Sequence, residues 1–220
     1  MAPHVLLVAS QKGGSGKTTL ARSLAVTATR AGRRVLLLDL DPQASLTSWW
    51  ERREADDLEL ATPPRVGHIA EHLAGLEGYD LAVIDTPPSD HRWLVQIAAA
   101  ATLALVPVRP SPDDLRAVGA TLDMLDRAGC PWASVLSQVP PRARIGGEAA
   151  RVLAQHGRLA PPNVHLRVAH AEAAATGLTA TELGDAAAKA EIEELWRYVD
   201  ALLRQPAALR HGATTSAGAV

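Results

Sequence analysis

The sequence contains no phenylalanine and one cysteine among its 220 residues. Because Cys130 stands alone, the chain has no intramolecular disulfide framework and no zinc or iron–sulfur centre built from several thiolates of one chain. No apolar run reaches the roughly 18–20 residues that a membrane-spanning helix needs. The N-terminus also lacks a charged start before a long apolar stretch, as a signal peptide would have. We therefore expect a cytoplasmic protein.

Lysine is scarce as well, since 19 of the 22 basic residues are arginine. Two of the three lysines, Lys12 and Lys17, nevertheless lie in one short segment, which points to a place where a compact ammonium group is needed. The net charge of −2 argues against a wholly basic nucleic-acid-binding protein, although it allows a local basic patch. The apolar fraction of 47% is ordinary for a soluble globular protein.

Short apolar runs alternate with helical patterns along the chain. We expect strands at 5–9, 35–38, 81–84, 103–108, 132–136 and 164–168, and helices at 17–30, 111–128, 146–155 and 186–203. Buried strands between helices predict an α/β fold: a mainly parallel twisted sheet with helices on both faces. We expect one domain over residues 1–205, followed by a flexible tail over 206–220.

A glycine-rich segment with two lysines follows the first expected strand and opens the first expected helix. Its glycines allow a tight turn whose N–H groups bind phosphate at the positive end of a helix. Lys17 would reach the β- and γ-phosphates, Thr18 would ligate Mg²⁺, and Thr19 would hold the α-phosphate. The segment therefore predicts a P-loop site for ATP and Mg²⁺, with these ATP-binding residues: Lys12, Gly13, Gly14, Ser15, Gly16, Lys17, Thr18 and Thr19.

Carboxylates follow the next two apolar strands. Asp39 and Asp41 stand two residues apart just past the second expected strand, where α/β folds collect their ligands. Asp85 follows four apolar residues, as in a Walker B element, and would hold Mg²⁺. Aspartate and proline are also turn formers, so a simple strand-to-loop turn is the alternative interpretation of Asp39 and Asp41.

Three strings of residues together resemble the ParA/MinD family of deviant Walker A ATPases. They are Lys-Gly-Gly-Ser-Gly-Lys-Thr at 12–18, Asp-Leu-Asp-Pro-Gln at 39–43 and Asp-Thr-Pro-Pro at 85–88, and the resemblance extends over roughly residues 4–203. It implies that Lys12 crosses a dimer interface to the nucleotide of the other subunit, where a cation offsets charge on the transferred phosphoryl group. It further implies catalytic residues Lys12, Lys17 and Asp41, with Asp41 acting on the attacking water, and metal-site residues Thr18, Asp39 and Asp85.

Two less specific features complete the comparison with that family. The proline-rich stretch after the fourth strand resembles a family segment near the base, which implies Pro107 and Arg109 as ATP-binding residues; a rigid proline loop is the alternative. Residues 140–170 carry five arginines against Glu148 alone. Relatives bind DNA without sequence preference through basic residues in this part of the chain, and a solvated arginine face is the alternative. The implied DNA-binding residues are Arg167, Arg142, Arg144 and Lys189.

The resemblance implies a short ParA-type partition ATPase without an N-terminal helix-turn-helix domain, because the first strand begins near residue 4. It would form a homodimer with ATP–Mg²⁺ and bind non-specific double-stranded DNA. A ParB-like or other adaptor would stimulate its slow hydrolysis of ATP. The expected outcome is segregation of plasmid or chromosome DNA, or positioning of a protein cargo, at the nucleoid and without membrane binding. The alternatives are a metabolic synthetase of the dethiobiotin or cobyrinate type, and a non-enzymatic module with ATP as a structural ligand.

Overall fold

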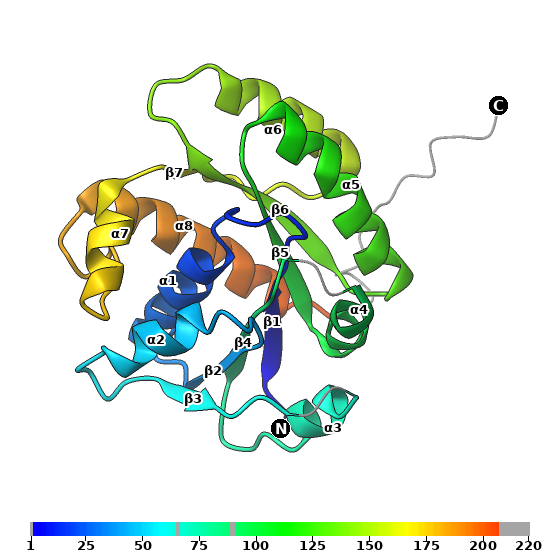
Figure 1. Ribbon diagram of the computed structural model, residues 1–220, viewed down its shortest axis with the longest axis vertical. Coiled ribbons are helices and arrows are strands. Elements are labelled where there is room, and N and C mark those ends of the chain that lie inside the picture. The colour runs from blue at the N-terminus through cyan, green and yellow to red at the C-terminus, as the bar shows by residue number, and fades with distance from the viewer. Residues whose placement is uncertain (1, 65–66, 89–90, 207–220) are drawn as a thin grey trace.

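The computed structural model describes residues 2–64, 67–88 and 91–206. Its centre is a seven-stranded sheet with the strand order β3-β2-β4-β1-β5-β6-β7, in which every strand pair is parallel (Figure 1). The strands are β1 (His4–Val8), β2 (Val35–Asp39), β3 (Glu59–Ala61), β4 (Leu81–Asp85), β5 (Leu103–Val108), β6 (Trp132–Val139) and β7 (Val164–His165). The inner strands are apolar and buried along their length, as strands covered on both faces must be.

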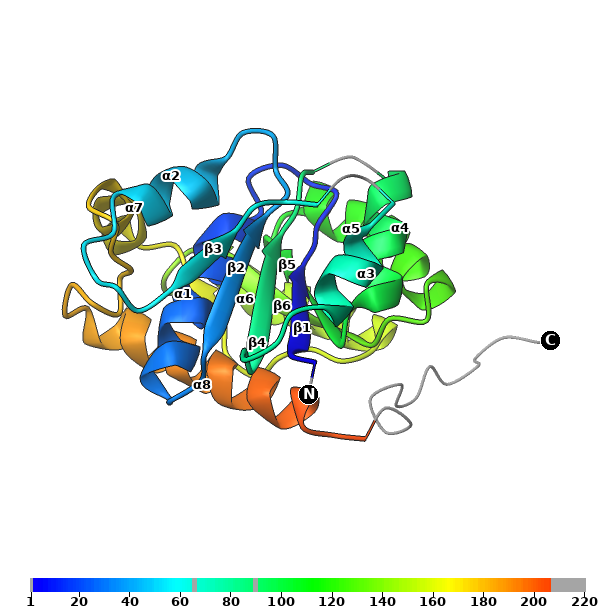
Figure 2. The ribbon, with the colours of Figure 1, turned by 90° about the horizontal axis from the view of Figure 1, so that it is seen from below.

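Helices cover both faces of the sheet, which confirms the predicted fold class (Figure 2). One core lies between the sheet and the helices α1 (Lys17–Arg30), α2 (Ser45–Glu51) and α8 (Ala186–Leu203). The other lies beneath α3 (Ile69–Ala74), α4 (His91–Ala100), α5 (Pro112–Arg127) and α6 (Ile145–His156). The short α7 (Val168–Ala175) follows β7 at the end of the sheet nearest α1.

The long helices begin where capping residues dictate. The Ser111 hydroxyl accepts the Asp114 N–H at the start of α5, and Pro112 takes the first helical position, which needs no N–H donor. The Asp185 carboxylate accepts two N–H groups at the start of α8. The predicted bounds of α8 are confirmed, and its buried face packs against α1 through the residues Ile192, Leu195, Trp196, Val199 and Leu202.

Several short elements differ from the sequence-based expectations. The predicted strand at 164–168 ends at His165, because Val168 already begins α7. The strand predicted at 132–136 continues to Val139. The elements β3, α2, α3, α4 and α7 were not predicted, since runs this short carry little periodicity. Of the predicted tail at 206–220, residues 207–220 lie outside the described residues.

The register of the sheet positions the acidic side chains. Asp39 at the end of β2 pairs in register with Asp85 at the end of β4, and Asp85 is also level with Val8 of β1. The segment that follows β1 and opens α1 therefore starts beside both carboxylates. The carboxyl edge of the sheet thus holds the three segments that the motifs singled out.

Candidate functional site at the carboxyl edge of the sheet

The glycine-rich segment forms a tight loop between β1 and α1. Gly14 and Gly16 have φ angles of 71° and 97°, a region that side chains rarely adopt. A β-carbon on Gly16 would also lie 2.7 Å from the Ser137 hydroxyl oxygen. Glycine at this position is therefore required twice, by the backbone conformation and by the close approach of β6.

The end of β6 fixes the outer side of this loop. The Ser137 hydroxyl donates to the Ser15 carbonyl oxygen at 2.8 Å, and the Gln138 amide donates to the Gly14 carbonyl. Gln138 holds a φ of 54°, a strained value for a residue with a side chain, and such strain concentrates at functional sites. These carbonyl contacts leave the loop N–H groups to face the opposite side. Motif spacing did not reveal either contact, because the partners are more than 120 residues apart.

Thr18 and Asp85 meet at the centre of the site. The Thr18 hydroxyl donates to Asp85 Oδ2 at 2.6 Å, and Asp85 is fully buried. Burial raises the pKa of Asp85 to about 7, assisted by the charges of Asp39 and Asp41 and opposed by the Thr18 hydrogen bond and by Lys17. A buried carboxylate in this state gains stability from a cation beside it.

The donor set of this site fits Mg²⁺. Magnesium prefers oxygen ligands and is usually held by one or two carboxylates together with substrate phosphates and water. The Thr18 hydroxyl and the Asp85 carboxylate are the oxygen donors that would hold it here. Among the described residues, no three His, Cys, Asp or Glu side chains gather as an all-protein metal cage.

Asp85 makes the stability of the nucleotide-free protein depend on pH. Its pKa of about 7 exceeds the ordinary value of 3.8, so between these values the folded state binds the proton and the unfolded state does not. This contribution to stability therefore falls as the pH rises through that window. We expect Asp85→Asn to unfold at a higher temperature than the wild type at about pH 8, with a smaller difference at about pH 5.

Thermal unfolding in EDTA without nucleotide tests this expectation. Asp56→Asn, which changes an exposed carboxylate beyond α2, is the matched control and should unfold like the wild type at both pH values. A difference between Asp85→Asn and wild type that stays constant with pH would contradict the assigned protonation of Asp85.

Lys17 and Asp41 belong to one hollow over the loop. This hollow has a volume of about 370 Å³ and is lined by residues 13–19, Asp41, Gln43, Ser45, Pro88 and Gln138. The Lys17 side chain is buried, which lowers its pKa, while Asp85 and Asp41 act in the opposite direction. The structure thus brings together the predicted residues Lys17, Thr18, Asp41 and Asp85 around a space suited to phosphate groups.

Asp39 is placed one step behind this hollow. Its Oδ2 accepts the N–H and the hydroxyl of Thr47 at 2.8 and 3.0 Å, and its Oδ1 accepts the Asp41 N–H at 3.1 Å. The buried carboxylate therefore holds the first turn of α2 and orients the segment that carries Asp41. Its contact with Mg²⁺ stays a prediction, and the observed hydrogen bonds give it a positioning role.

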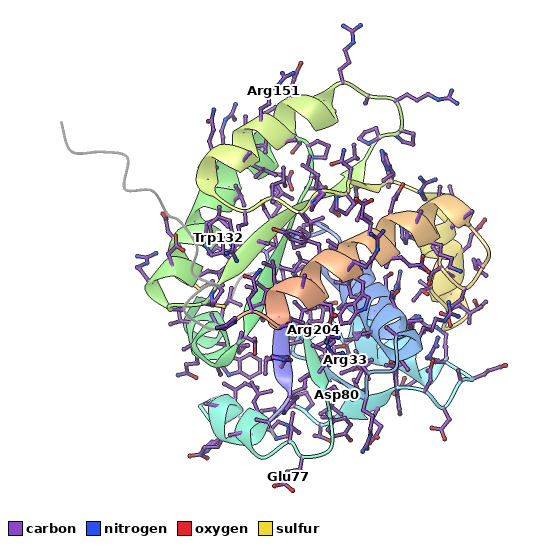
Figure 3. All side chains as sticks on the ribbon, turned by 180° about the vertical axis from the view of Figure 1, so that it is seen from behind. Arg33, Glu77, Asp80, Trp132, Arg151 and Arg204 are labelled. Carbon is purple, nitrogen blue, oxygen red and sulfur yellow. The ribbon has the colours of Figure 1, made fainter. Side chains whose placement is uncertain are left out.

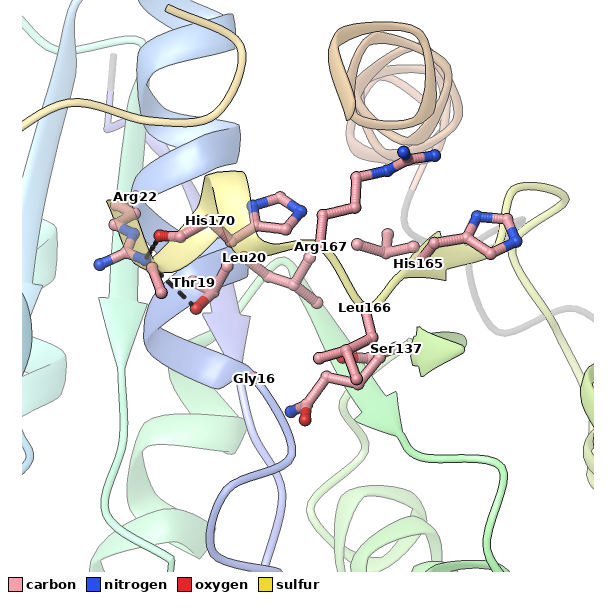
Figure 4. A pocket seen from close by; sticks show the side chains of 12 residues that line it. Gly16, Thr19, Leu20, Arg22, Ser137, His165, Leu166, Arg167 and His170 are labelled. Carbon is pink, nitrogen blue, oxygen red and sulfur yellow. Dashed lines mark hydrogen bonds between the residues drawn. The ribbon is translucent and has the colours of Figure 1, made fainter. Parts of the chain in front are cut away.

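A second hollow of about 340 Å³ continues from the first (Figure 4). Gly16, Thr19 and Gln138 line both, and the apolar part of the second is formed by Leu20, Val164 and Leu166. Apolar hollows with a few polar groups are typical of sites for the base of a nucleotide.

Arg22 forms one wall of this hollow, and sequence reasoning missed it. Its guanidinium donates to the Thr19 hydroxyl at 3.4 Å and to the His170 carbonyl oxygen at 2.9 Å, which connects α1 to α7 (Figure 4). Burial lowers its pKa to about 10. At neutral pH the group is therefore a buried cation beside the end of the phosphate loop.

Pro107 and Arg109, predicted to lie around the base, are placed elsewhere. Pro107 pairs with Val135 inside the sheet and lies near Lys12, and Arg109 forms an ion pair with Asp114. Neither lines the hollow beside Thr19. The prediction is corrected because the chain turns outward after β5, toward α5 and away from β7.

Two of the four predicted DNA-binding residues are engaged within the chain. Arg167 donates to Glu191 and lies near Asp185, on the wall of the second hollow, so its charge is compensated there. Lys189 pairs with Glu193 at 3.7 Å on α8. Arg142 and Arg144, by contrast, are exposed in the turn before α6, and Arg151 is exposed on that helix (Figure 3).

Comparisons with known proteins agree with this geometry. Residues 6–210 match the family described as the CobQ/CobB/MinD/ParA nucleotide binding domain. The chain belongs to this family. It is 38% identical over 188 residues to "Maintenance of carboxysome distribution protein A" of Gloeobacter kilaueensis, covering 80% of this chain and 83% of that relative. It is also 38% identical over 173 residues to the "Chromosome-partitioning ATPase Soj" of Thermus thermophilus, covering 64% and 66%.

Solved structures show that the ParA/MinD fold is shared. The cell division ATPase MinD of Pyrococcus furiosus superimposes with a TM-score of 0.77 at 18% identity, over 92% of this chain and all of that one. Cobyrinic acid a,c-diamide synthase of Mycobacterium smegmatis superimposes with a TM-score of 0.68 at 23% identity, which reflects the common fold alone. The chain is an ATP-hydrolysing enzyme of the ParA/MinD type. No helix within the described residues is long and apolar enough to span a membrane.

Proposed function

We propose that this chain is a ParA-type positioning ATPase that switches between a free state and an ATP-bound homodimer. The observation that carries the proposal is the division of labour between the two lysines of the loop. Lys17 lines the phosphate hollow of its own chain, whereas Lys12 lines neighbouring hollows on the outer side of the loop. A lysine in that place faces a second molecule and is suited to complete its site.

Each residue of the phosphate hollow has a chemical task in this proposal. Loop N–H groups and Lys17 bind the phosphates of ATP, and Thr18 and Asp85 hold Mg²⁺ against them. Asp41 orients the water that attacks the γ-phosphorus. Bound Mg²⁺ supplies charge neutralisation of the phosphates when ATP is present. The base lies in the hollow between Leu20 and Leu166.

DNA binding in the dimer is assigned to the exposed arginines near α6. Arg142, Arg144 and Arg151 are exposed within a stretch whose only acidic residue is Glu148. Such a patch binds the phosphate backbone without reading sequence, and pairing two copies doubles the number of contacts. This makes DNA binding depend on ATP and on salt, and it places the active form at the nucleoid.

The names of the relatives support a positioning role for the cycle. Two matching relatives are named for carboxysome distribution and others for chromosome or plasmid partitioning. We infer that a ParB-like or other adaptor on a cargo stimulates the slow hydrolysis of ATP and releases the dimer from DNA. The cargo is a DNA molecule or a protein assembly such as a carboxysome.

Co-sedimentation with non-specific double-stranded DNA tests the proposal. We expect retention with ATP–Mg²⁺, and little with ADP or without nucleotide. The double change Arg142→Ala and Arg144→Ala should weaken retention about tenfold or more and lower its salt dependence, because each lost cation removes a phosphate contact. Arg116→Ala is the control, since that exposed arginine lies on α5, remote from these two in the sequence. Retention that ignores the nucleotide would contradict the switch.

A further inference from the structure

Arg109 is held in a fixed position on the outer side of the phosphate loop. Its Nε and Nη2 donate to the two carboxylate oxygens of Asp114 at 2.9 and 3.1 Å. Asp114 is buried and also accepts the Ser111 hydroxyl. Burial acts to raise the pKa of Asp114, but these hydrogen bonds and the charges of Arg109 and Lys12 outweigh it, so the pKa is lowered. The carboxylate is therefore ionised and aims the guanidinium through a bidentate pair.

The free corner of this guanidinium lies against the loop. A β-carbon at Gly14 would be 3.8 Å from Arg109 Nη1, and one third of the Arg109 side chain is exposed. Arg109 and Lys12 line the same outer hollow of about 340 Å³, together with Ser111, Asp114 and Gln138. Neither of them lines the phosphate hollow of their own chain. Gln138 forms the wall between the two hollows.

The charge of the outer hollow is suited to an anion. Lys12 and Arg109 contribute two positive charges around the single buried carboxylate of Asp114. The other acidic residue on the wall, Asp113, is exposed and already pairs with Arg116 at 3.2 Å. A nucleotide triphosphate, which develops further charge as it is cleaved, complements this arrangement.

We propose that Arg109 enters the nucleotide site of a second copy of this chain together with Lys12, as a second cation acting in trans. The proposal rests on the homodimer proposed above. In hydrolysis, the water oxygen bonds to the γ-phosphorus, the bond to the β–γ bridging oxygen breaks, and its electron pair leaves with ADP. The water proton passes to the phosphate product. Arg109 offsets the negative charge that develops on the phosphate oxygens, and Asp114 is its positioning residue.

Single variants test whether Arg109 matters after ATP binding. We expect Arg109→Ala to bind ADP as the wild type does and to hydrolyse ATP about tenfold more slowly or worse, because arginines acting in trans commonly have larger effects than this. Arg116→Ala removes an equal charge from the same helix region and should retain wild-type hydrolysis. Weak ADP binding by a folded Arg109→Ala protein would instead place Arg109 in the site of its own chain.

A mixing experiment separates action in trans from action in cis. Arg109→Ala and Asp41→Ala chains are mixed in equal amounts before ATP is added. In a mixed dimer, the nucleotide of the Arg109→Ala chain meets its own Asp41 and the partner's intact arginine. Trans action therefore restores hydrolysis to about one quarter of the wild-type rate, because half of the dimers are mixed and each has one working site. A mixture no faster than its separate components would overturn the proposal.

The same experiment with Lys12→Ala in place of Arg109→Ala tests the dimer itself. Rescue with Lys12→Ala but not with Arg109→Ala refutes the role of Arg109 alone. Rescue with neither, in a wild type that stays monomeric with ATP, refutes the proposed function instead. Should removal of the arginine beside buried Asp114 prevent folding, Arg109→Gln retains an amide donor for that carboxylate and takes its place in the mixture.

Discussion

Lys17→Ala is expected to abolish binding of both ATP and ADP. The Lys17 ammonium is buried between the loop and the two carboxylates Asp85 and Asp41, and no other lysine lines the phosphate hollow. Each charge-assisted contact with a phosphate is worth about 1.5–3 kcal/mol. Two lost contacts therefore weaken binding about a hundredfold or more.

Isothermal titration calorimetry with ADP–Mg²⁺ measures this loss directly. Lys189→Ala is the control, because Lys189 is an exposed lysine that pairs only with Glu193 along α8 among the ion pairs of the described residues. Both variants should retain the circular dichroism spectrum of the wild type. A Lys17→Ala protein that binds ADP within a few fold of the wild type would contradict the phosphate site described here.

Asp41→Ala is expected to separate ATP binding from ATP hydrolysis. Asp41 lines the phosphate hollow, and its Oδ1 accepts the Gln43 N–H at 3.0 Å within its own turn. Its loss therefore leaves the loop and the metal ligands in place but removes the group that orients water. We expect hydrolysis to fall about a hundredfold or more, as for other groups that move or orient protons.

The same variant should accumulate as an ATP-bound dimer. Phosphate release and multi-angle light scattering measure the two effects on one sample, and Asp56→Ala serves as the control at an exposed carboxylate. A monomeric Asp41→Ala protein in saturating ATP, with the wild type dimeric, would show that Asp41 is needed for association rather than for attack by water.

The central sheet and the phosphate site could be predicted from the sequence because their signals are local. Continuous apolar runs mark β1, β2, β4 and β5, and each motif follows directly after one of the first three. The order of a parallel sheet brings the carboxyl ends of those strands together. The meeting of Thr18 with Asp85 thus follows from two motifs and one topological rule.

Other parts of the site depend on contacts that no spacing reveals. The hold of Ser137 on Ser15 and the position of Arg22 beside His170 join segments more than 100 residues apart. The direction of Arg109 is decided by the buried Asp114 on α5 rather than by its own proline-rich loop. Arg167 carries a charge that suggests DNA, but its orientation toward Glu191 is a property of the packed structure.

The anchoring of α2 limits how the molecule responds when the γ-phosphate departs. Trp49 donates its indole N–H to the Leu178 carbonyl oxygen at 2.9 Å, and Arg53 pairs with Glu182 at 2.9 Å. The helix can therefore tilt only by breaking buried contacts with the segment before α8. Residues 41–44, which end in the left-handed turn at Ala44, link this fixed helix to the fixed strand β2. Product formation is thus transmitted through a few backbone torsions beside the attacking water, on a much faster timescale than a rearrangement of domains.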